Sequence, residues 1–299
     1  LYFYWGCSDK DPIYGIELDY KNNFRPIGSK VSLLFANPKE YGWEVPGDYN
    51  NRYSNAPWIE GAWMNKLNGK YYLQYANPGT EFKSYSDGVY LSDKPLGPYT
   101  LAAHNPFAYK PEGFAAGAGH GSTFADKYGN YWHIGTITIS VKHMFERRLG
   151  LYPVFLDRDG VLYTDTRFGD YPMIIPQKKI ERFEDMFPGW MLLSYHKPVT
   201  VSSALESNPS TFMTDEEIRT YWAAQSGKDT EWAVIDLGMQ CNVFAVQINF
   251  AEHNTDIYGR QQDLGYQYVI EGSAANKAWE VLINQSANQT DHSHPYMQL

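Results

Sequence analysis

Residues 55–76, NAPWIEGAWMNKLNGKYYLQYA, contain the pattern that decides the fold. Residues 67–70 are a turn sequence with asparagine and glycine, the residue types that most readily adopt turn conformations. Residues 71–76 are rich in aromatic side chains, which suit the pleated surface of a sheet. The stretch therefore predicts a tight turn that leads directly into a β-strand.

The same combination of a glycine turn and an aromatic strand recurs along the first part of the chain. Its further copies are residues 128–134 and 159–163, with residues 1–5 as the strand alone. A second strand with an internal glycine follows at residues 14–19, 87–93 and 149–155. Antiparallel strand pairs that recur in this way predict a β-propeller. We expect residues 189–195 to form its last strand.

The sequence changes character after residue 195. Short apolar strands are predicted at residues 232–237, 243–250 and 266–272, joined by polar loops. Such a pattern indicates a β-sandwich or jelly roll. We therefore expect an all-β chain with a β-propeller at residues 1–194 and a β-sandwich at residues 195–299, the latter incomplete at its C-terminus.

Composition excludes several classes of protein. The net charge of −9 over 299 residues argues against nucleic-acid binding, which needs a basic surface. No apolar run approaches the roughly 20 residues of a membrane helix. Cys7 and Cys241 make neither a metal spacing nor a disulfide framework and are predicted to be unpaired core residues. The 25 Tyr, 15 Phe and 9 Trp suit either strands or contact with the apolar faces of sugars.

Glu60 is the first candidate for chemistry, because it lies between Trp58 and Trp63. Burial among apolar groups disfavours the charged form of a carboxyl and raises its pKa. A carboxylic acid that keeps its proton near neutral pH can act as a general acid. The alternative, weighted equally, is a strand-edge glutamate that accepts hydrogen bonds from backbone amides.

Other polar candidates lie further along the chain. His120 lies in the glycine-rich segment 116–122, where the glycines let the backbone approach another group closely. We expect His120 to lie near the site, either against substrate or, with less support, on a metal. Of the neighbours Arg147 and Arg148, only one can face a pocket from a strand, and we favour Arg148.

Aromatic side chains around Glu60 are candidates for stacking against a sugar. They are Trp58, Trp63, Tyr75 and Phe82. Each is as a rule more often a core residue than a platform for a ligand. Residues 79–85 join the two strands that follow Glu60 and are expected to form the rim of a pocket.

The segments 57–61, 68–75 and 92–99 resemble glycoside hydrolase family 43, and the resemblance continues through 117–123 and 126–132. It extends over roughly residues 1–195. It implies a five-bladed β-propeller and an inverting glycosidase in which Glu60 is the general acid. No cofactor is implied for the chemistry.

The same resemblance implies two aspartates, a base and a residue that tunes the acid, in positions that would precede Leu1. Asp9, Asp11 and Asp19 do not match those positions. We therefore expect the chain to begin inside a longer protein and to lack the first blade. A divergent member of the family without the usual base is the alternative.

The second half resembles the discoidin, or coagulation factor 5/8 type C, domains. The segments that carry this resemblance are residues 202–203, 214–222, 231–238 and 268–273. Domains of this kind often bind carbohydrate. The resemblance places Asp215 in a loop near a structural calcium, where oxygen ligands would suit the ion. The alternative is a solvated acidic turn.

Together these features predict a glycosidase similar to arabinofuranosidases and xylosidases, with β-galactosides also open as substrates, and with an appended carbohydrate-binding module. The rival hypothesis is a propeller that binds glycans without cleaving them. We expect a carbohydrate substrate, a monomer, and a secreted, periplasmic or cell-surface location, with any export signal upstream of Leu1.

Overall fold

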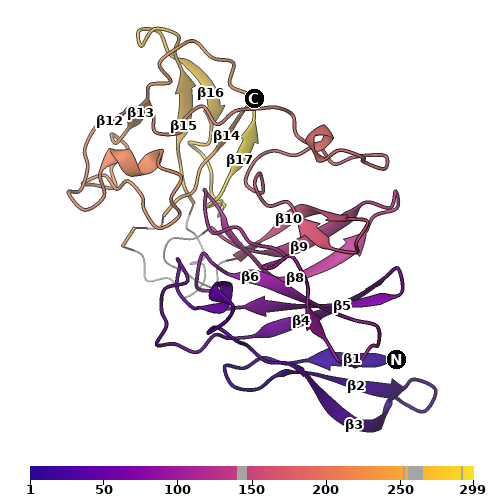
Figure 1. Cartoon of the computed structure of the whole chain (residues 1–299). Helices are drawn as coiled ribbons and strands as arrows, with labels where there is room; N and C mark the ends of the chain where they lie inside the picture. The colour runs from indigo at the N-terminus through magenta and orange to yellow at the C-terminus, as the bar shows by residue number, and fades with distance from the viewer. Residues whose placement is uncertain (140–146, 252, 255–264, 291) are drawn as a thin grey trace. The chain divides into compact units, whose positions relative to one another are not determined.

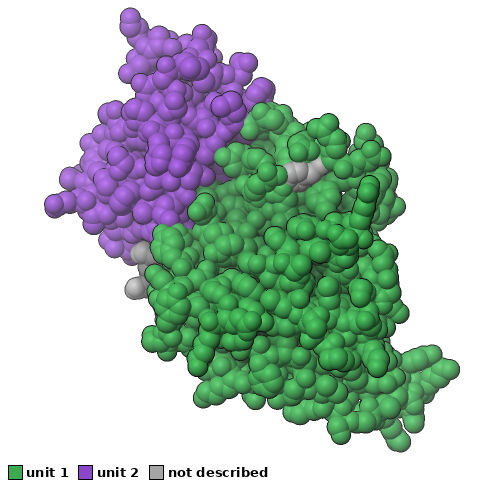
Figure 2. Space-filling model, in the orientation of Figure 1, with its two compact units in different colours: residues 1–138, 147–190 green, residues 139–146, 191–299 purple. Residues whose placement is uncertain are grey.

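The computed structural model describes residues 1–139, 147–251, 253–254, 265–290 and 292–299. These residues are almost entirely strands, turns and loops, as predicted, with only short 3-10 turns as helix. They divide into two compact units (Figure 2). Unit 1 comprises residues 1–138 and 147–190, and unit 2 comprises residues 139–146 and 191–299. The predicted domain boundary after residue 194 falls slightly beyond this division.

Unit 1 contains three antiparallel sheets, each built from strands that follow one another in the chain (Figure 1). The first sheet is β1 (Tyr2–Trp5), β2 (Ile13–Asp19) and β3 (Arg25–Leu34). The second is β4 (Glu60–Leu67), β5 (Lys70–Asn77), β6 (Ser86–Ser92) and β7 (Thr100–Leu101). The third is β8 (Ala116–Ala125), β9 (Tyr131–Thr138), β10 (Arg147–Leu156) and β11 (Leu162–Thr164). These meanders are the blades that the glycine-turn repeat predicted.

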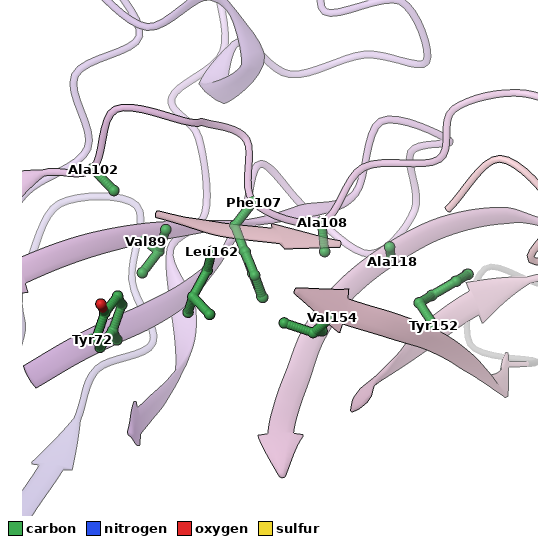
Figure 3. Packing of buried hydrophobic residues seen from close by; sticks show 9 residues of the cluster. All are labelled: Tyr72, Val89, Ala102, Phe107, Ala108, Ala118, Tyr152, Val154 and Leu162. Carbon is green, nitrogen blue, oxygen red and sulfur yellow. The ribbon is translucent and has the colours of Figure 1, made fainter. Parts of the chain in front are cut away.

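Both faces of the aromatic strand β5 are covered by other strands, so β5 is a central strand of unit 1. Successive residues of a strand point to opposite faces. Tyr72 therefore packs into a core cluster with residues of the third sheet, such as Tyr152 (Figure 3). Leu73 and Tyr75 pack on the other side with Ile13 of the first sheet. The second sheet is thus held between its neighbours by two apolar layers.

The expected last strand at residues 189–195 is not formed, which corrects the prediction. The segment pairs with no other strand among the described residues. Gly189 has φ +74°, and Met191 is 79% exposed. An apolar run becomes a strand only where a sheet edge offers hydrogen bonds, and here the chain follows an irregular path instead. Before it, η1 (Gly42–Glu44) and η2 (Phe183–Met186) are short 3-10 turns.

Unit 2 is a β-sandwich of short paired strands, as predicted. β12 (Val199–Val201) pairs with β13 (Ala233–Ile235), and β14 (Ala245–Gln247) pairs with β17 (Tyr296–Gln298). The third pair is β15 (Val269–Gly272) with β16 (Glu280–Asn284), and η3 (Ser210–Met213) follows β12. Inside the unit, Phe250 stacks on Tyr266 with ring centroids 4.0 Å apart. Among the described residues no helix has the length and apolar character that crossing a membrane requires.

Candidate active site

Glu60 is the first residue of β4, at the point where the second sheet approaches the third. It pairs with Ala76 of β5, and the register of the two strands shifts between Glu60 and Trp63. Such a bulge re-aims the side chains beside it. The Glu60 side chain is 17% exposed, so the carboxyl is largely enclosed but open to solvent on one side.

Each carboxyl oxygen of Glu60 has its own hydrogen-bond donor. The Tyr85 hydroxyl donates to Oε1 at 2.7 Å. The Cys7 thiol donates to Oε2 at 3.3 Å. The thiol in turn accepts a hydrogen bond from Trp58 Nε1 at 3.1 Å. The carboxyl is thereby fixed between one buried phenol and one exposed thiol.

His120 lies on the Oε1 side of the carboxyl. Its Nδ1 is 3.5 Å from Glu60 Oε1 and 3.4 Å from the Tyr85 hydroxyl. His120 has φ +52°, a conformation that is uncommon for a residue other than glycine. The Asp87 carboxylate holds this irregular part of β8 in place, since it accepts hydrogen bonds from the amides of His120 at 2.8 Å and Gly121 at 2.9 Å.

Asp87 is completely buried and belongs to β6. Besides the two amides, its Oδ2 lies 3.3 Å from Nε2 of His133, which is also completely buried. Thr123 and Ala118 lie within hydrogen-bond distance of the two ring nitrogens of His133. The network extends from the second sheet into the third and fixes His120 in front of Glu60.

The glycines of this region make room for side chains of the site. A Cβ at Gly61 would lie 2.9 Å from ring atoms of His120, and a Cβ at Gly119 would lie 2.9 Å from ring atoms of Tyr85. Gly61 also has φ +64°. The glycine that follows Glu60 is therefore required for the histidine to reach the carboxyl.

The electrostatics of Glu60 correct the prediction that burial would raise its pKa. Hydrogen bonding to His120 is the main cause that lowers the pKa of Glu60 to about 2, and Tyr85 and Cys7 lower it further. Together they outweigh the desolvation of the carboxyl. The same interaction raises the pKa of His120 above its usual value, against the effect of burial. Burial, followed by the charge of Glu60, raises the pKa of the Tyr85 phenol far above its ordinary range.

The aromatic candidates have different surroundings. Trp58 is 42% exposed beside the carboxyl and keeps an open ring surface. Trp63 is 38% exposed, and its indole donates to the Thr123 carbonyl at 3.0 Å, so it joins the second sheet to the third. Phe82 is only 5% exposed and lies beneath the Arg52 guanidinium, 5.1 Å from the ring centroid. Phe82 is thus a core residue, which corrects its assignment as a stacking platform.

The two neighbouring arginines have different hydrogen-bond partners. The charge of Arg147 acts on Tyr85 and His120, and its guanidinium donates to Thr80 Oγ1 at 3.1 Å. Arg148, the residue favoured from the sequence, donates to the backbone carbonyl of Arg147 at 3.1 Å. The structure therefore places Arg147 close to the candidate site, and the prediction for Arg148 stays a prediction.

The metal predictions for His120 and Asp215 stay predictions. Among the described residues, no group of three or more His, Cys, Asp or Glu could hold an ion. His120 is turned toward Glu60 and Tyr85. Asp215 accepts hydrogen bonds from the Glu217 amide at 3.1 Å and from the Thr220 hydroxyl at 2.7 Å.

Sequence reasoning missed three residues of the site. Tyr85 ends the segment that was expected to form a pocket rim, which was the only signal for it. Asp87 gave no signal beyond its place in a predicted strand. Cys7 was expected in the core but is exposed, although both cysteines are free as predicted. All three reach Glu60 or His120 from distant parts of the chain, so spacing along the sequence does not reveal them.

Consecutive antiparallel blades define a class of fold, the β-propeller, and here an enclosed carboxyl lies where two blades meet. The model of glycosyl hydrolases family 43 matches residues 1–162, and the chain belongs to this family. The model of the NedA-like, galactose-binding domain matches residues 212–297. Both resemblances seen in the sequence are thereby confirmed.

Solved structures are similar in part. A thermostable family-43 glycoside hydrolase is 22% identical, with a TM-score of 0.41, over 51% of this chain and 46% of that one. An endo-1,4-beta-xylanase from Bacteroides thetaiotaomicron VPI-5482 is 21% identical, with a TM-score of 0.43, over 55% of this chain and 53% of that one. A further glycoside hydrolase is 19% identical, with a TM-score of 0.44, over 100% of this chain and 62% of that one. The chain thus spans about half the length of the first two. No curated protein matches it.

Proposed function

We propose that this protein is an inverting glycosidase in which Glu60 protonates the glycosidic oxygen. The observation that carries the proposal is the environment of this carboxyl in a chain of family 43. It is enclosed, fixed at both oxygens, paired with His120 and bordered by the exposed ring of Trp58. Trp58 offers an apolar face against which the C–H surface of a sugar can lie.

In the proposed step one proton is transferred and one glycosidic bond is broken. The proton on Glu60 moves to the glycosidic oxygen while the bond from that oxygen to the anomeric carbon breaks. The leaving sugar departs as an alcohol, and Glu60 becomes a carboxylate. Water attacks the anomeric carbon from the opposite face and gives its proton to a second carboxylate, which acts as the base. The groups that hydrogen-bond to Glu60 are His120, Tyr85 and Cys7, so the base is not one of them.

The low pKa of Glu60 requires a source for this proton. Between the pKa of Glu60 and that of His120, the pair holds one proton, which lies on the histidine. A bound sugar removes water from the pair and disfavours two separated charges. The neutral arrangement, with the proton on Glu60, therefore gains weight when substrate is bound. The two groups titrate as a pair.

The test is hydrolysis of aryl arabinofuranosides, xylosides and galactosides by the protein in its complete natural form and by its Glu60→Gln variant. General acid catalysis contributes roughly 10²- to 10⁴-fold, so we expect a loss of that size. The loss should be smaller for leaving groups that depart without a proton. Glu280→Gln on β16, an exposed glutamate of unit 2, is the matched control. Equal activity of Glu60→Gln and the unmodified protein would refute the assignment.

A glycan-binding propeller without hydrolysis is the second candidate. The observation that favours it is the low pKa of Glu60, which leaves the carboxyl ionised at neutral pH when no sugar is bound. Binding of the same sugars without hydrolysis of any glycoside would select this candidate. For unit 2 we propose sugar binding, in keeping with its galactose-binding family. A monomeric state and a location outside the cytoplasm stay predictions.

A further inference from the structure

We propose that Tyr85 is the positioning residue of the acid: its phenol holds Oε1 of Glu60, so that Oε2 is the oxygen that delivers the proton. The inference rests on the proposed function and deepens it. It assigns different tasks to the two oxygens of one carboxyl. Tyr85 touches neither substrate nor the reacting atoms and acts only through Glu60.

The two hydrogen bonds to Glu60 are unequal. The bond from the Tyr85 hydroxyl to Oε1 is 2.7 Å long, which is typical of a good O–H···O hydrogen bond. The bond from the Cys7 thiol to Oε2 is 3.3 Å long, and a thiol is a weak donor. A glycosidic oxygen can therefore displace the thiol far more easily than the phenol.

Burial adds to this difference. Tyr85 is 1% exposed, whereas Cys7 is exposed. Oε1 thus lies against a buried phenol, and Oε2 lies against an exposed thiol. An oxygen that is covered by a buried phenol cannot reach a substrate, which leaves Oε2 for this task.

The packing around Tyr85 prevents the phenol from moving away. Gly119 presents its backbone to the ring, where a Cβ would lie 2.9 Å from ring atoms. The backbone of Tyr85 is fixed as well, because its carbonyl accepts from Ala118 N at 2.9 Å and its amide donates to Phe82 O at 3.1 Å. The phenol is therefore a rigid support for the carboxyl, which positioning requires.

The Tyr85 hydroxyl also lies between the acid and His120. A phenol has one proton, and this one is donated to Glu60. The single Nδ1–H of His120 is shared between this oxygen, 3.4 Å away, and Glu60 Oε1, 3.5 Å away. Tyr85 and His120 both lie on the Oε1 side, so a proton that leaves Nδ1 of His120 passes to solvent, and Oε2 takes its proton from solvent before a sugar covers the site. After proton transfer the same phenol stabilises the carboxylate that is left behind.

The test compares Tyr85→Phe with Tyr72→Phe. Tyr72 is a matched control, because it is also 1% exposed and its hydroxyl donates to a backbone carbonyl, that of Gly160, at 2.7 Å. For alkyl or sugar leaving groups we expect Tyr85→Phe to lower kcat by about 10- to 100-fold, because a small misplacement of a catalytic group can cost about 10²-fold. For activated aryl leaving groups the loss should be only a few-fold. KM should change little in both cases.

A second readout does not depend on hydrolysis. The carboxyl carbon of Glu60, assigned by its absence in Glu60→Gln, is followed by NMR through a pH titration. Loss of a donor to the charged form should move its titration upward by about one pH unit in Tyr85→Phe and leave it unchanged in Tyr72→Phe. An equal loss of kcat for all leaving groups, or an unchanged titration, would overturn the inference. If the unmodified protein hydrolyses no glycoside, the proposed function fails, and the titration alone decides whether Tyr85 controls the proton on Glu60.

Discussion

Replacing Gly61 with alanine tests whether His120 can reach Glu60 only because residue 61 has no side chain. Gly61 has φ +64°, and a Cβ there would meet Cδ2 and Cγ of the His120 ring at 2.9 Å and its Cα at 3.3 Å. Gly69 is the matched control, because it has φ +84° and a Cβ there would meet nothing within 4 Å. Both substitutions carry the backbone cost of a left-handed conformation, about 1–2 kcal/mol.

Only the first substitution also displaces a neighbour. Overpacking of this kind costs about 1–3 kcal/mol, and the lower end applies here because the His120 side chain is 47% exposed and can move outward. We therefore expect Gly61→Ala to lower the free energy of unfolding by about 1 kcal/mol more than Gly69→Ala. The measurement is urea denaturation followed by tryptophan fluorescence, with hydrolysis assayed in parallel. Equal midpoints together with equal hydrolysis rates for the two variants would refute the reasoning.

Three further predictions concern the groups around the site and the loops of unit 1. Asp87→Ala leaves the part-buried amide of His120 and the buried amide of Gly121 without their acceptor and should cost about 2 kcal/mol in urea denaturation, with loss of hydrolysis. The pKa of Glu60 is lowered from 4.5 to about 2 and that of His120 is raised above 6.5. The carboxylate therefore contributes stability above pH 4.5 that is lost toward pH 2, and the imidazolium contributes stability below pH 6.5 that is lost as pH rises through its folded pKa. The Tm of Glu60→Gln should accordingly vary less with pH in both windows, and an identical pH dependence would contradict the pairing. Lys110→Met removes the ion-pair partner of Asp170, whose carboxylate lies 3.1 Å from the Lys110 ammonium. Both side chains are less than a tenth exposed, so the free energy of unfolding should fall by about 3–5 kcal/mol. An unchanged denaturation midpoint would contradict this prediction.

The fold was predictable where the sequence contains both a turn and a strand. The strand at residues 71–76 and the strands after residues 129 and 160 follow glycine turns and lie in sheets. Residues 189–195 have the apolar content of a strand but no partner among the described residues. Whether an apolar segment pairs depends on which sheet edge is free, and this is a property of the assembled unit rather than of the segment.

The site was predictable only in its central residue. Trp58 and Trp63 correctly placed Glu60 at the edge of an apolar region, but they misled on its pKa. The groups that decide the pKa are His120, Tyr85 and Cys7, which come from other segments of the chain. Neighbours in sequence reveal desolvation, whereas the donors that oppose desolvation come from tertiary structure. The sign of the shift could therefore not be read from the sequence.

The glycine-rich segment around His120 shows that a motif can be recognised in a sequence although the group it accommodates cannot. Glycines near a histidine were expected to let the backbone approach another group, and a ligand was one candidate for that group. In the structure the approaching groups are the rings of Tyr85 and His133, since a Cβ at Gly119 or Gly121 would collide with them. The glycines thus act on the acid indirectly, because Gly119 admits the phenol that holds Oε1 and Gly121 admits His133, which lies against Asp87. An alanine at either position should impair the site through packing alone, without removing any group that touches the substrate.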